Sequence, residues 1–299
     1  MSDSHFLRGL GVALVTPFHE DGSIDFRALE KLVMHQARGG TDFLVVLGTT
    51  GETPTLDENE QRQVVDFIIE VSRGQLPIVV GVTGNATRAL CDRISSWNVE
   101  GISAFLVASP AYNKPSQAGI VQHFTEVANF AKLPVILYNV PGRTASNMEA
   151  ATTLALAQHP NVCGIKEASG NLIQIEQIIA ERPKGFLVWS GDDALAMPTV
   201  AMGAEGVISV LGNAFPQELG AMIQQAAFGQ VHEARETHKM FANVISLLFE
   251  EGNPVGIKSA LSHLGLCQPT VRLPLVEASK PLSDQLYSAL ATIDVQTTR

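Results

Sequence analysis

A lysine, Lys166, stands inside an apolar stretch of this sequence, in the run Gly164–Glu167. An amine that is removed from water is favoured in its neutral form, which attacks ketones and forms a Schiff base with them. The strand pattern alone leaves two placements open: Lys166 ends its strand with the amine in water, or the amine lies in a desolvated pocket. The second placement predicts Schiff-base chemistry.

Other polar side chains that suit such chemistry follow other apolar runs. The phenol of Tyr138 is suited to moving protons while a carbinolamine forms and loses water. Arg143 follows a Pro-Gly turn, and a guanidinium suits bidentate binding of a carboxylate. Thr49 and Thr50 lie between two glycines, where hydroxyls and backbone amides are able to hold a small carboxylate. A core tyrosine, a surface ion pair and a plain tight turn are the structural alternatives.

Short apolar runs recur along the chain, each followed by a longer helical pattern. Asp57–Glu60 and Asn171 supply helix-start signals between them. Continuous apolar strands joined by helices indicate a parallel sheet covered on both faces, so we expect an α/β (β/α)8 TIM barrel. A doubly wound open sheet is the alternative, but no dinucleotide or phosphate-binding glycine motif follows a strand. The eight predicted strands are Gly11–Thr16, Phe43–Gly48, Pro77–Gly81, Ala104–Ser109, Pro134–Asn139, Val162–Glu167, Phe186–Gly191 and Gly206–Val210.

The strand signal stops at about Phe215, and the rest of the chain predicts a C-terminal all-helical extension. Three prolines interrupt this tail, which favours several short helices. We therefore expect a catalytic barrel domain over residues 1–225 and a helical domain over residues 226–299. The predicted tail helices are Gln217–Ala227, His232–Glu250, Val255–Leu264 and Ser283–Thr292.

Composition excludes several classes of protein. The 299 residues carry a formal net charge of −10 and no block of Lys or Arg, so neither nucleic acid nor an anionic membrane is an expected partner. No apolar stretch is long enough for a membrane helix, and the N-terminus lacks an apolar leader pattern, so we expect a cytoplasmic protein. The histidines are scattered and Cys91, Cys163 and Cys267 form no metal-binding spacing, so we expect free thiols and no metal.

Taken together, the motifs resemble the dihydrodipicolinate (4-hydroxy-tetrahydrodipicolinate) synthase family within the N-acetylneuraminate lyase superfamily. The resemblance covers about residues 10 to 215, and its motifs agree with the family in order and spacing. They are Ala13–Phe18, Gly48–Glu52, Tyr112–Pro115, Tyr138–Thr144 and Gly164–Gly170, extended by Ser190–Asp193 and Gly206–Ser209.

The resemblance implies a lyase in which Lys166 forms a covalent imine with pyruvate, so that no cofactor is required. The enamine then attacks the aldehyde of L-aspartate 4-semialdehyde, and cyclisation through the substrate amine releases the lysine. The product feeds lysine and diaminopimelate biosynthesis. These reactions are what membership of the family would imply.

The resemblance also implies roles for the other site residues. Tyr138, Thr49 and Tyr112 correspond to a proton relay. Thr50, with nearby amides, corresponds to the site of the pyruvate carboxylate, and Arg143 to a group that receives the carboxylate of the aldehyde substrate. Backbone groups of two further residues are expected to line the pocket: Gly191 and Ile208.

Family members place the tyrosine that matches Tyr112 in the active site of a neighbouring subunit, which implies a homodimer or, more often, a tetramer built from two dimers. Many members have a second tyrosine where this chain has Ala111, and that tyrosine packs at the tight dimer interface. Glu58, Gln61 and Ala89 also replace the His, His and Glu of lysine-inhibited members. We therefore expect a softer dimer interface and weak or no inhibition by L-lysine.

Alternatives of two kinds remain: other aldolases of the superfamily and a barrel without catalytic activity. N-acetylneuraminate lyase and 2-keto-3-deoxy sugar-acid aldolases share the Schiff-base lysine and differ in the pocket for the aldehyde. Arg143 and the pair Thr49-Thr50 favour the synthase over these aldolases. A non-catalytic barrel is the alternative from another class, since a fold does not by itself prove a function.

Overall fold

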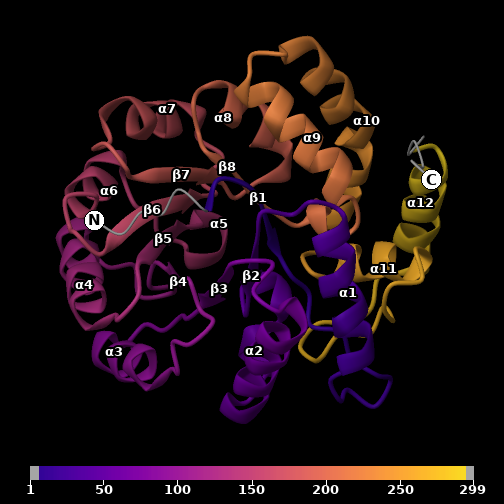
Figure 1. Cartoon of the computed structure of the whole chain (residues 1–299), viewed down its shortest axis with the longest axis horizontal. Helices are drawn as coiled ribbons and strands as arrows, with labels where there is room; N and C mark the ends of the chain where they lie inside the picture. The colour runs from indigo at the N-terminus through magenta and orange to yellow at the C-terminus, as the bar shows by residue number, and fades with distance from the viewer. Residues whose placement is uncertain (1–6, 294–299) are drawn as a thin grey trace.

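The computed structural model describes residues 7–293 and contains a closed barrel of eight parallel strands, in which each strand pairs with the next and β8 pairs with β1. Figure 1 shows the helices arranged around this barrel and the C-terminal helices gathered at one side of it. The expected TIM barrel with a helical extension is confirmed. The strands are β1 (Gly9–Ala13), β2 (Phe43–Val46), β3 (Ile78–Gly81), β4 (Ala104–Ala108), β5 (Val135–Asn139), β6 (Val162–Glu167), β7 (Leu187–Ser190) and β8 (Gly206–Ser209).

The first strand differs from its prediction, because β1 ends at Ala13 and the predicted run continues to Thr16. Leu14 and Val15 are buried beyond the last residue of β1, and the Leu14 N–H still donates to the Val45 carbonyl of β2 at 3.0 Å. The N–H of Val15 donates to the side chain of Asn213 at 3.1 Å instead of to a neighbouring strand. Apolar loop residues that are buried beyond a strand end therefore extend the apolar pattern past the strand itself.

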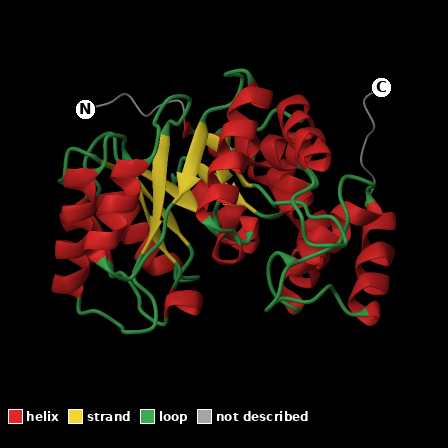
Figure 2. Ribbon diagram, turned by 90° about the horizontal axis from the view of Figure 1, so that it is seen from below, coloured by secondary structure: helices red, strands yellow, loops and turns green. Residues whose placement is uncertain are grey.

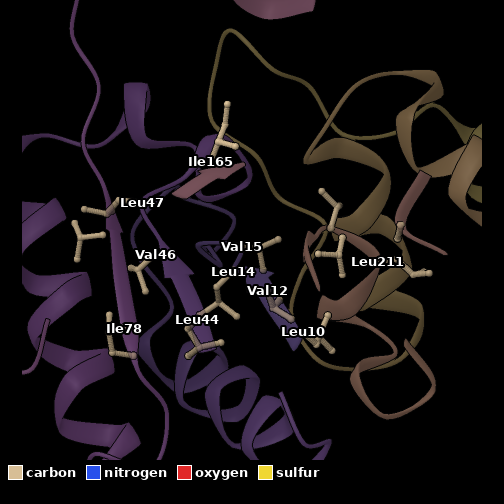
Figure 3. Close-up of a cluster of buried hydrophobic side chains, with 14 of the residues drawn as sticks. Leu10, Val12, Leu14, Val15, Leu44, Val46, Leu47, Ile78, Ile165 and Leu211 are labelled. Atoms are coloured by element: carbon tan, nitrogen blue, oxygen red, sulfur yellow. The ribbon is translucent and has the colours of Figure 1, made fainter. Parts of the chain in front are cut away.

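Side chains alternate between two separate apolar cores along each strand, as expected for a barrel. Residues such as Leu10, Val12 and Leu44 face the surrounding helices and belong to the larger core, part of which Figure 3 shows. The inward-facing residues form a smaller core inside the barrel. Leu7 and Trp189 belong to this inner core, and the Trp189 indole N–H donates to the Leu7 carbonyl at 2.7 Å.

Helices cover the outside of the barrel, and two of them begin where the sequence predicts. The side chain of Asp57 caps α2 in a capping box with Glu60, and the side chain of Asn171 caps α7. The strands lie between helices on both sides (Figure 2). The helices of this layer are α1 (Phe26–Arg38), α2 (Glu58–Ser72), α3 (Thr87–Ser96), α4 (Gln117–Phe130), α6 (Ala150–Leu156), α7 (Leu172–Glu181), α8 (Ala196–Ala201) and α9 (Pro216–Ala227). The short helix α5 (Pro141–Thr144) and the 3-10 turns follow strand ends instead, and the turns are η2 (Thr49–Gly51), η3 (Thr53–Thr55), η4 (Asp193–Leu195) and η5 (Leu211–Asn213).

The C-terminal region consists of helices α10 (Val231–Glu250), α11 (Val255–His263) and α12 (Lys280–Ala291). The first two lie within one residue of their predicted bounds, whereas α12 begins before the predicted Ser283, because Pro281 is accommodated in its first turn. Helix α9 packs against β1, so it belongs to the barrel layer, and the predicted domain boundary at residue 225 falls in its last turn. The outer ends of both predicted domains, residues 1–6 and 294–299, lie outside the described residues. The segment after α11 returns to the barrel, where Lys31 of α1 donates to the carbonyl of Gly265.

Candidate active site

The side chain of Lys166 points into the barrel. It stands in β6 between Ile165 and Glu167, and Ile165 belongs to the outer core, so the alternation of the strand turns Lys166 inward. Lys166 is 6% exposed, and its Nζ lies 4.5 Å from the ring centre of Tyr138, which pairs with it across β5 and β6. Of the two placements that the sequence leaves open, the structure therefore has the desolvated one.

Gly191 follows β7 and lies directly against the lysine side chain. A Cβ at this position would stand 2.9 Å from Cε and 3.0 Å from Cγ of Lys166, and 2.8 Å from Cβ of Ala168. Only glycine leaves room for the lysine in its present conformation. Ile208 of β8 is fully buried and belongs to the same inner core as Tyr138. The structure thus brings the predicted residues Lys166, Tyr138, Gly191 and Ile208 to the barrel interior.

Thr49 and Thr50 form the 3-10 turn η2 that follows β2, at the same end of the barrel as the mouth residues of β5 to β8. Thr49 is partly buried, whereas Thr50 is 2% exposed. The turn is closed by backbone bonds, and the Thr16 hydroxyl donates to the Gly51 carbonyl at 2.8 Å. Two hydroxyls are thus fixed on a rigid turn at the carboxyl end of a strand.

Tyr112 and Arg143 stand at the rim of the barrel and do not contact Lys166. Tyr112 is 90% exposed and has a left-handed backbone conformation with φ of 72°. Its N–H donates to the carbonyl of Thr144, so the loop of Tyr112 lies beside helix α5, which carries Arg143. Arg143 is exposed, and within residues 7–293 its guanidinium has no partner. Both side chains are therefore accessible at the rim of the barrel.

A buried carboxylate next to Lys166 was not singled out from the sequence as a site residue. Glu167 points outward and is 1% exposed, and it accepts hydrogen bonds from Asn139 (3.0 and 3.1 Å), Gln174 (3.0 Å) and the Ser169 N–H (2.7 Å). Burial raises the pKa of Glu167. The network ties the ends of β5 and β6 together, which fixes Tyr138 relative to Lys166. A glutamate directly after a lysine in a strand is a signal for such an outward-facing anchor.

A second buried carboxylate ties together the ends of β7 and β8. Asp193 accepts hydrogen bonds from the Ser209 hydroxyl at 2.5 Å and from the N–H groups of Val210 and Leu211 at 3.0 and 2.8 Å. Burial raises the pKa of Asp193. This carboxylate holds the strand end next to Gly191, so the wall behind Lys166 is rigid. The motif Ser190–Asp193 contains it, although the sequence does not show which partner it binds.

Within residues 7–293, no three His, Cys, Asp or Glu side chains come together as metal ligands. None of the helices described between Leu7 and Ile293 has the length and apolar character needed to cross a membrane.

Comparisons with known proteins identify the family of this chain. The family model for the dihydrodipicolinate synthetase family matches residues 6–293. A 4-hydroxy-tetrahydrodipicolinate synthase of Phocaeicola vulgatus is 51% identical over 291 residues, which cover 97% of this chain and 98% of the relative.

Two of the similar solved structures each have a TM-score of 0.93. One is a chloride-inhibited dihydrodipicolinate synthase of Acinetobacter baumannii complexed with pyruvate, with 37% identity and coverage of 95% of this chain and 98% of that chain. The other is a monomeric dihydrodipicolinate synthase variant, with 35% identity and coverage of 96% and 97%. The chain belongs to the dihydrodipicolinate synthetase family.

Proposed function

We propose that this protein is a 4-hydroxy-tetrahydrodipicolinate synthase, a lyase that joins pyruvate and L-aspartate 4-semialdehyde through a Schiff base on Lys166. Relatives with this name align with nearly the whole chain, at up to 51% identity. The observation that carries the proposal is the placement of Lys166. Its amine is buried at the carboxyl end of β6, against the ring of Tyr138, in a closed barrel.

The first step is addition of the Lys166 amine to the keto carbon of pyruvate. The carbinolamine loses water to give a protonated imine, and Tyr138, Thr49 and Tyr112 move the protons that this step requires. The positive charge of the imine nitrogen lies close to the face of the Tyr138 ring, whose quadrupole attracts a cation. The site thereby stabilises the charged intermediate and activates the carbonyl with no cofactor.

The second step forms the carbon–carbon bond. Loss of a methyl proton converts the imine into an enamine, whose terminal carbon attacks the aldehyde of L-aspartate 4-semialdehyde. The amine of that substrate then attacks the imine carbon and closes the ring, which breaks the bond to Lys166 and releases the lysine. One water molecule leaves in the overall reaction, and the aldehyde oxygen stays as the product hydroxyl.

Carboxylate recognition is divided between two places at the barrel mouth. Thr50 and backbone amides of η2 hold the carboxylate of pyruvate, on a turn that is already rigid. Arg143 receives the carboxylate of the semialdehyde at the rim, where its exposed guanidinium suits bidentate binding. The backbone of Gly191 and Ile208 lines the remaining wall beside Lys166.

The proposed assembly is a homodimer or a tetramer of two dimers. Tyr112 supports this because its side chain is 90% exposed at the rim and does not reach Lys166 of its own subunit. In an oligomer the phenol would enter the mouth of the neighbouring barrel and complete the proton relay there. A cytoplasmic location fits a biosynthetic enzyme of this kind and is part of the same proposal.

A substrate comparison tests the proposed activity. Purified protein is incubated with pyruvate and L-aspartate 4-semialdehyde, and the product is followed by mass spectrometry, with and without a chelator. We expect turnover that needs both substrates and is unchanged by the chelator. Cleavage of N-acetylneuraminate or of a 2-keto-3-deoxy sugar acid with a higher kcat/KM would contradict the proposal and assign the protein to another aldolase activity.

A further inference from the structure

We propose that Asn253, in the C-terminal helical region, is a positioning residue that turns the hydroxyl of Thr50 toward the carboxylate of pyruvate. Asn253 lies in the short connection between α10 and α11, outside the barrel sequence. Its side-chain Nδ2 donates a hydrogen bond of 2.9 Å to the Oγ1 of Thr50, across 203 residues of sequence. The inference rests on the proposed function of the site and assigns a further residue to it.

The hydrogen bond fixes the direction in which the Thr50 hydroxyl donates. A threonine hydroxyl has one hydrogen to donate and lone pairs that accept. Because Asn253 donates to Oγ1, the hydroxyl hydrogen must point elsewhere, and within residues 7–293 it donates to no protein acceptor. Thr50 is 2% exposed and stands at the barrel mouth, so a substrate carboxylate is an acceptor of the right chemistry.

The fold of the turn does not depend on Asn253. The backbone of η2 is already closed by bonds from Gly51 N–H to the Gly48 carbonyl and from Glu52 N–H to the Thr49 carbonyl. The Thr53 hydroxyl adds a bond to Gly48 at 3.1 Å. The one group of this turn to which Asn253 donates is the hydroxyl of Thr50. Its role is therefore to orient a side chain that is attached to an independently fixed backbone.

Asn253 itself carries an unsatisfied polar atom. The residue is 8% exposed, and its Oδ1 has no hydrogen-bond partner among residues 7–293. A buried acceptor without a partner destabilises the fold, and a residue with a purely structural role would be better replaced by an apolar one. A specific need for the donor Nδ2 explains why an asparagine is present here.

The same region of the tail fixes the position of the turn. Lys258 of α11 is fully buried, and its Nζ lies 2.5 Å from Oε1 of Glu52, which follows the turn. The Arg272 N–H donates to the other oxygen of Glu52 at 2.9 Å. Lys258 Nζ and the Arg272 guanidinium also lie 4.1 and 4.4 Å from the ring centre of Phe18, which follows β1. Lys258 and Arg272 thus hold the backbone in place, and Asn253 sets the hydroxyl.

The buried ion pair of Lys258 and Glu52 shows that the C-terminal tail contacts the turn η2 in a specific way. Burial lowers the pKa of Lys258, and the neighbouring Glu52 carboxylate opposes that effect. Such a pair stabilises a fold little in comparison with apolar packing, but removal of one partner leaves an unpaired buried charge. The tail is therefore held in a single register against the turn. That register brings Asn253 to Thr50.

Steady-state kinetics of the full chain test the inference. We expect Asn253→Ala to raise the KM for pyruvate about tenfold, as one lost hydrogen bond to a charged ligand would, while kcat changes less than about twofold. Asn253→Asp keeps the shape of the side chain, but a carboxylate only accepts hydrogen bonds. The Thr50 hydroxyl would then donate to residue 253 rather than to the substrate, so we expect a larger rise in KM. Asn243, exposed on α10, supplies the control Asn243→Ala, which leaves KM unchanged.

A double-mutant cycle separates orientation from general damage to the fold. In the background Thr50→Val, which lacks the hydroxyl, Asn253→Ala is expected to cause no further rise in KM. An equal rise in both backgrounds, or an unchanged KM in Asn253→Ala, would overturn the inference. Since KM does not depend on the fraction of folded enzyme, partial unfolding of a variant leaves the comparison valid. If the unaltered protein forms no imine with pyruvate, the proposed function fails too; if only the cycle fails, that function stands.

Discussion

Lys166 and Tyr138 pair directly across β6 and β5, and the lysine Nζ lies 4.5 Å from the centre of the tyrosine ring. The ring and the hydroxyl of Tyr138 have different chemical roles, which substitutions can separate. The ring face stabilises a positive charge on the nitrogen, and the hydroxyl moves protons. The buried Glu167 network fixes the strand ends that carry both residues.

Replacement of Tyr138 by phenylalanine keeps the ring and removes the proton-moving group. We expect Tyr138→Phe to lower kcat by about 10²- to 10⁴-fold while the protein keeps its thermal stability, since general acid–base groups contribute on this scale. Steady-state rates and thermal unfolding measure the two effects. Activity close to that of the unaltered protein would show that the Tyr138 hydroxyl moves no proton in the rate-limiting step.

A methyl group at position 191 tests the fit of Lys166. Gly191→Ala would bring a Cβ to 2.9 Å from Cε of Lys166, so the lysine must leave its conformation. We expect kcat/KM for pyruvate to fall by roughly 10- to 100-fold, because misplacement by about 1 Å has effects of this size. Gly119→Ala on α4, where a Cβ meets its neighbours only at 3.5 Å, is the matched control and keeps full activity. Similar losses in both variants would contradict this account.

Stability at acidic pH depends on the pair of Glu60 and Arg272. The two hydrogen bonds of 2.7 and 2.6 Å from the guanidinium hold the pKa of Glu60 below its usual range. The unfolded chain, in which Glu60 keeps its ordinary pKa of about 4.3, takes up protons first as pH falls. The stabilisation from this pair is therefore present above that value and is lost as pH falls through the lowered pKa of the folded state.

The difference in free energy of unfolding between the unaltered protein and Glu60→Gln should thus be largest at neutral pH and shrink as pH falls below about 4. Urea unfolding at a series of pH values measures it, and Asp284→Asn, which removes an exposed pair with Lys280, is the control with little effect. A difference in free energy of unfolding that stays constant down to the lowest pH measured would refute the lowered pKa of Glu60.

The chain is expected to respond weakly or not at all to L-lysine. Glu58, Gln61 and Ala89 line one surface hollow, and Gln61 already donates to the carbonyl of Leu56 at 2.9 Å. Ala89 gives this hollow no carboxylate, so a cationic ligand lacks the partner that a glutamate at this position would supply.

We expect less than half inhibition at about 1 mM L-lysine, which corresponds to binding weaker than about −4 kcal/mol. Initial rates at fixed substrate concentrations measure it, and Ala89→Glu, which restores a carboxylate, is expected to increase the sensitivity. Half inhibition of the unaltered protein at micromolar L-lysine would show that the hollow binds lysine by other contacts.

The sequence predicts strand β6 with its observed bounds, because a short run that begins with apolar residues is followed by a turn at Gly170 and by the helix-start signal of Asn171. The direction in which the Lys166 side chain points cannot be predicted from that strand alone, because it depends on which residues of β6 the closed barrel turns inward. Asn253 and Lys258 could not be found at all from local patterns. Their partners Thr50 and Glu52 lie more than 200 residues away, and an asparagine between two helices looks like an ordinary loop residue.

Covalent trapping of the imine tests the central claim most directly. The protein is incubated with pyruvate and borohydride, and intact and peptide masses are measured, with Lys166→Ala in parallel and L-aspartate 4-semialdehyde as a competing electrophile. We predict one reduced pyruvate adduct on the peptide that contains Lys166, absent from Lys166→Ala and diminished by the semialdehyde. An adduct on another lysine, or none, would contradict the Schiff-base mechanism.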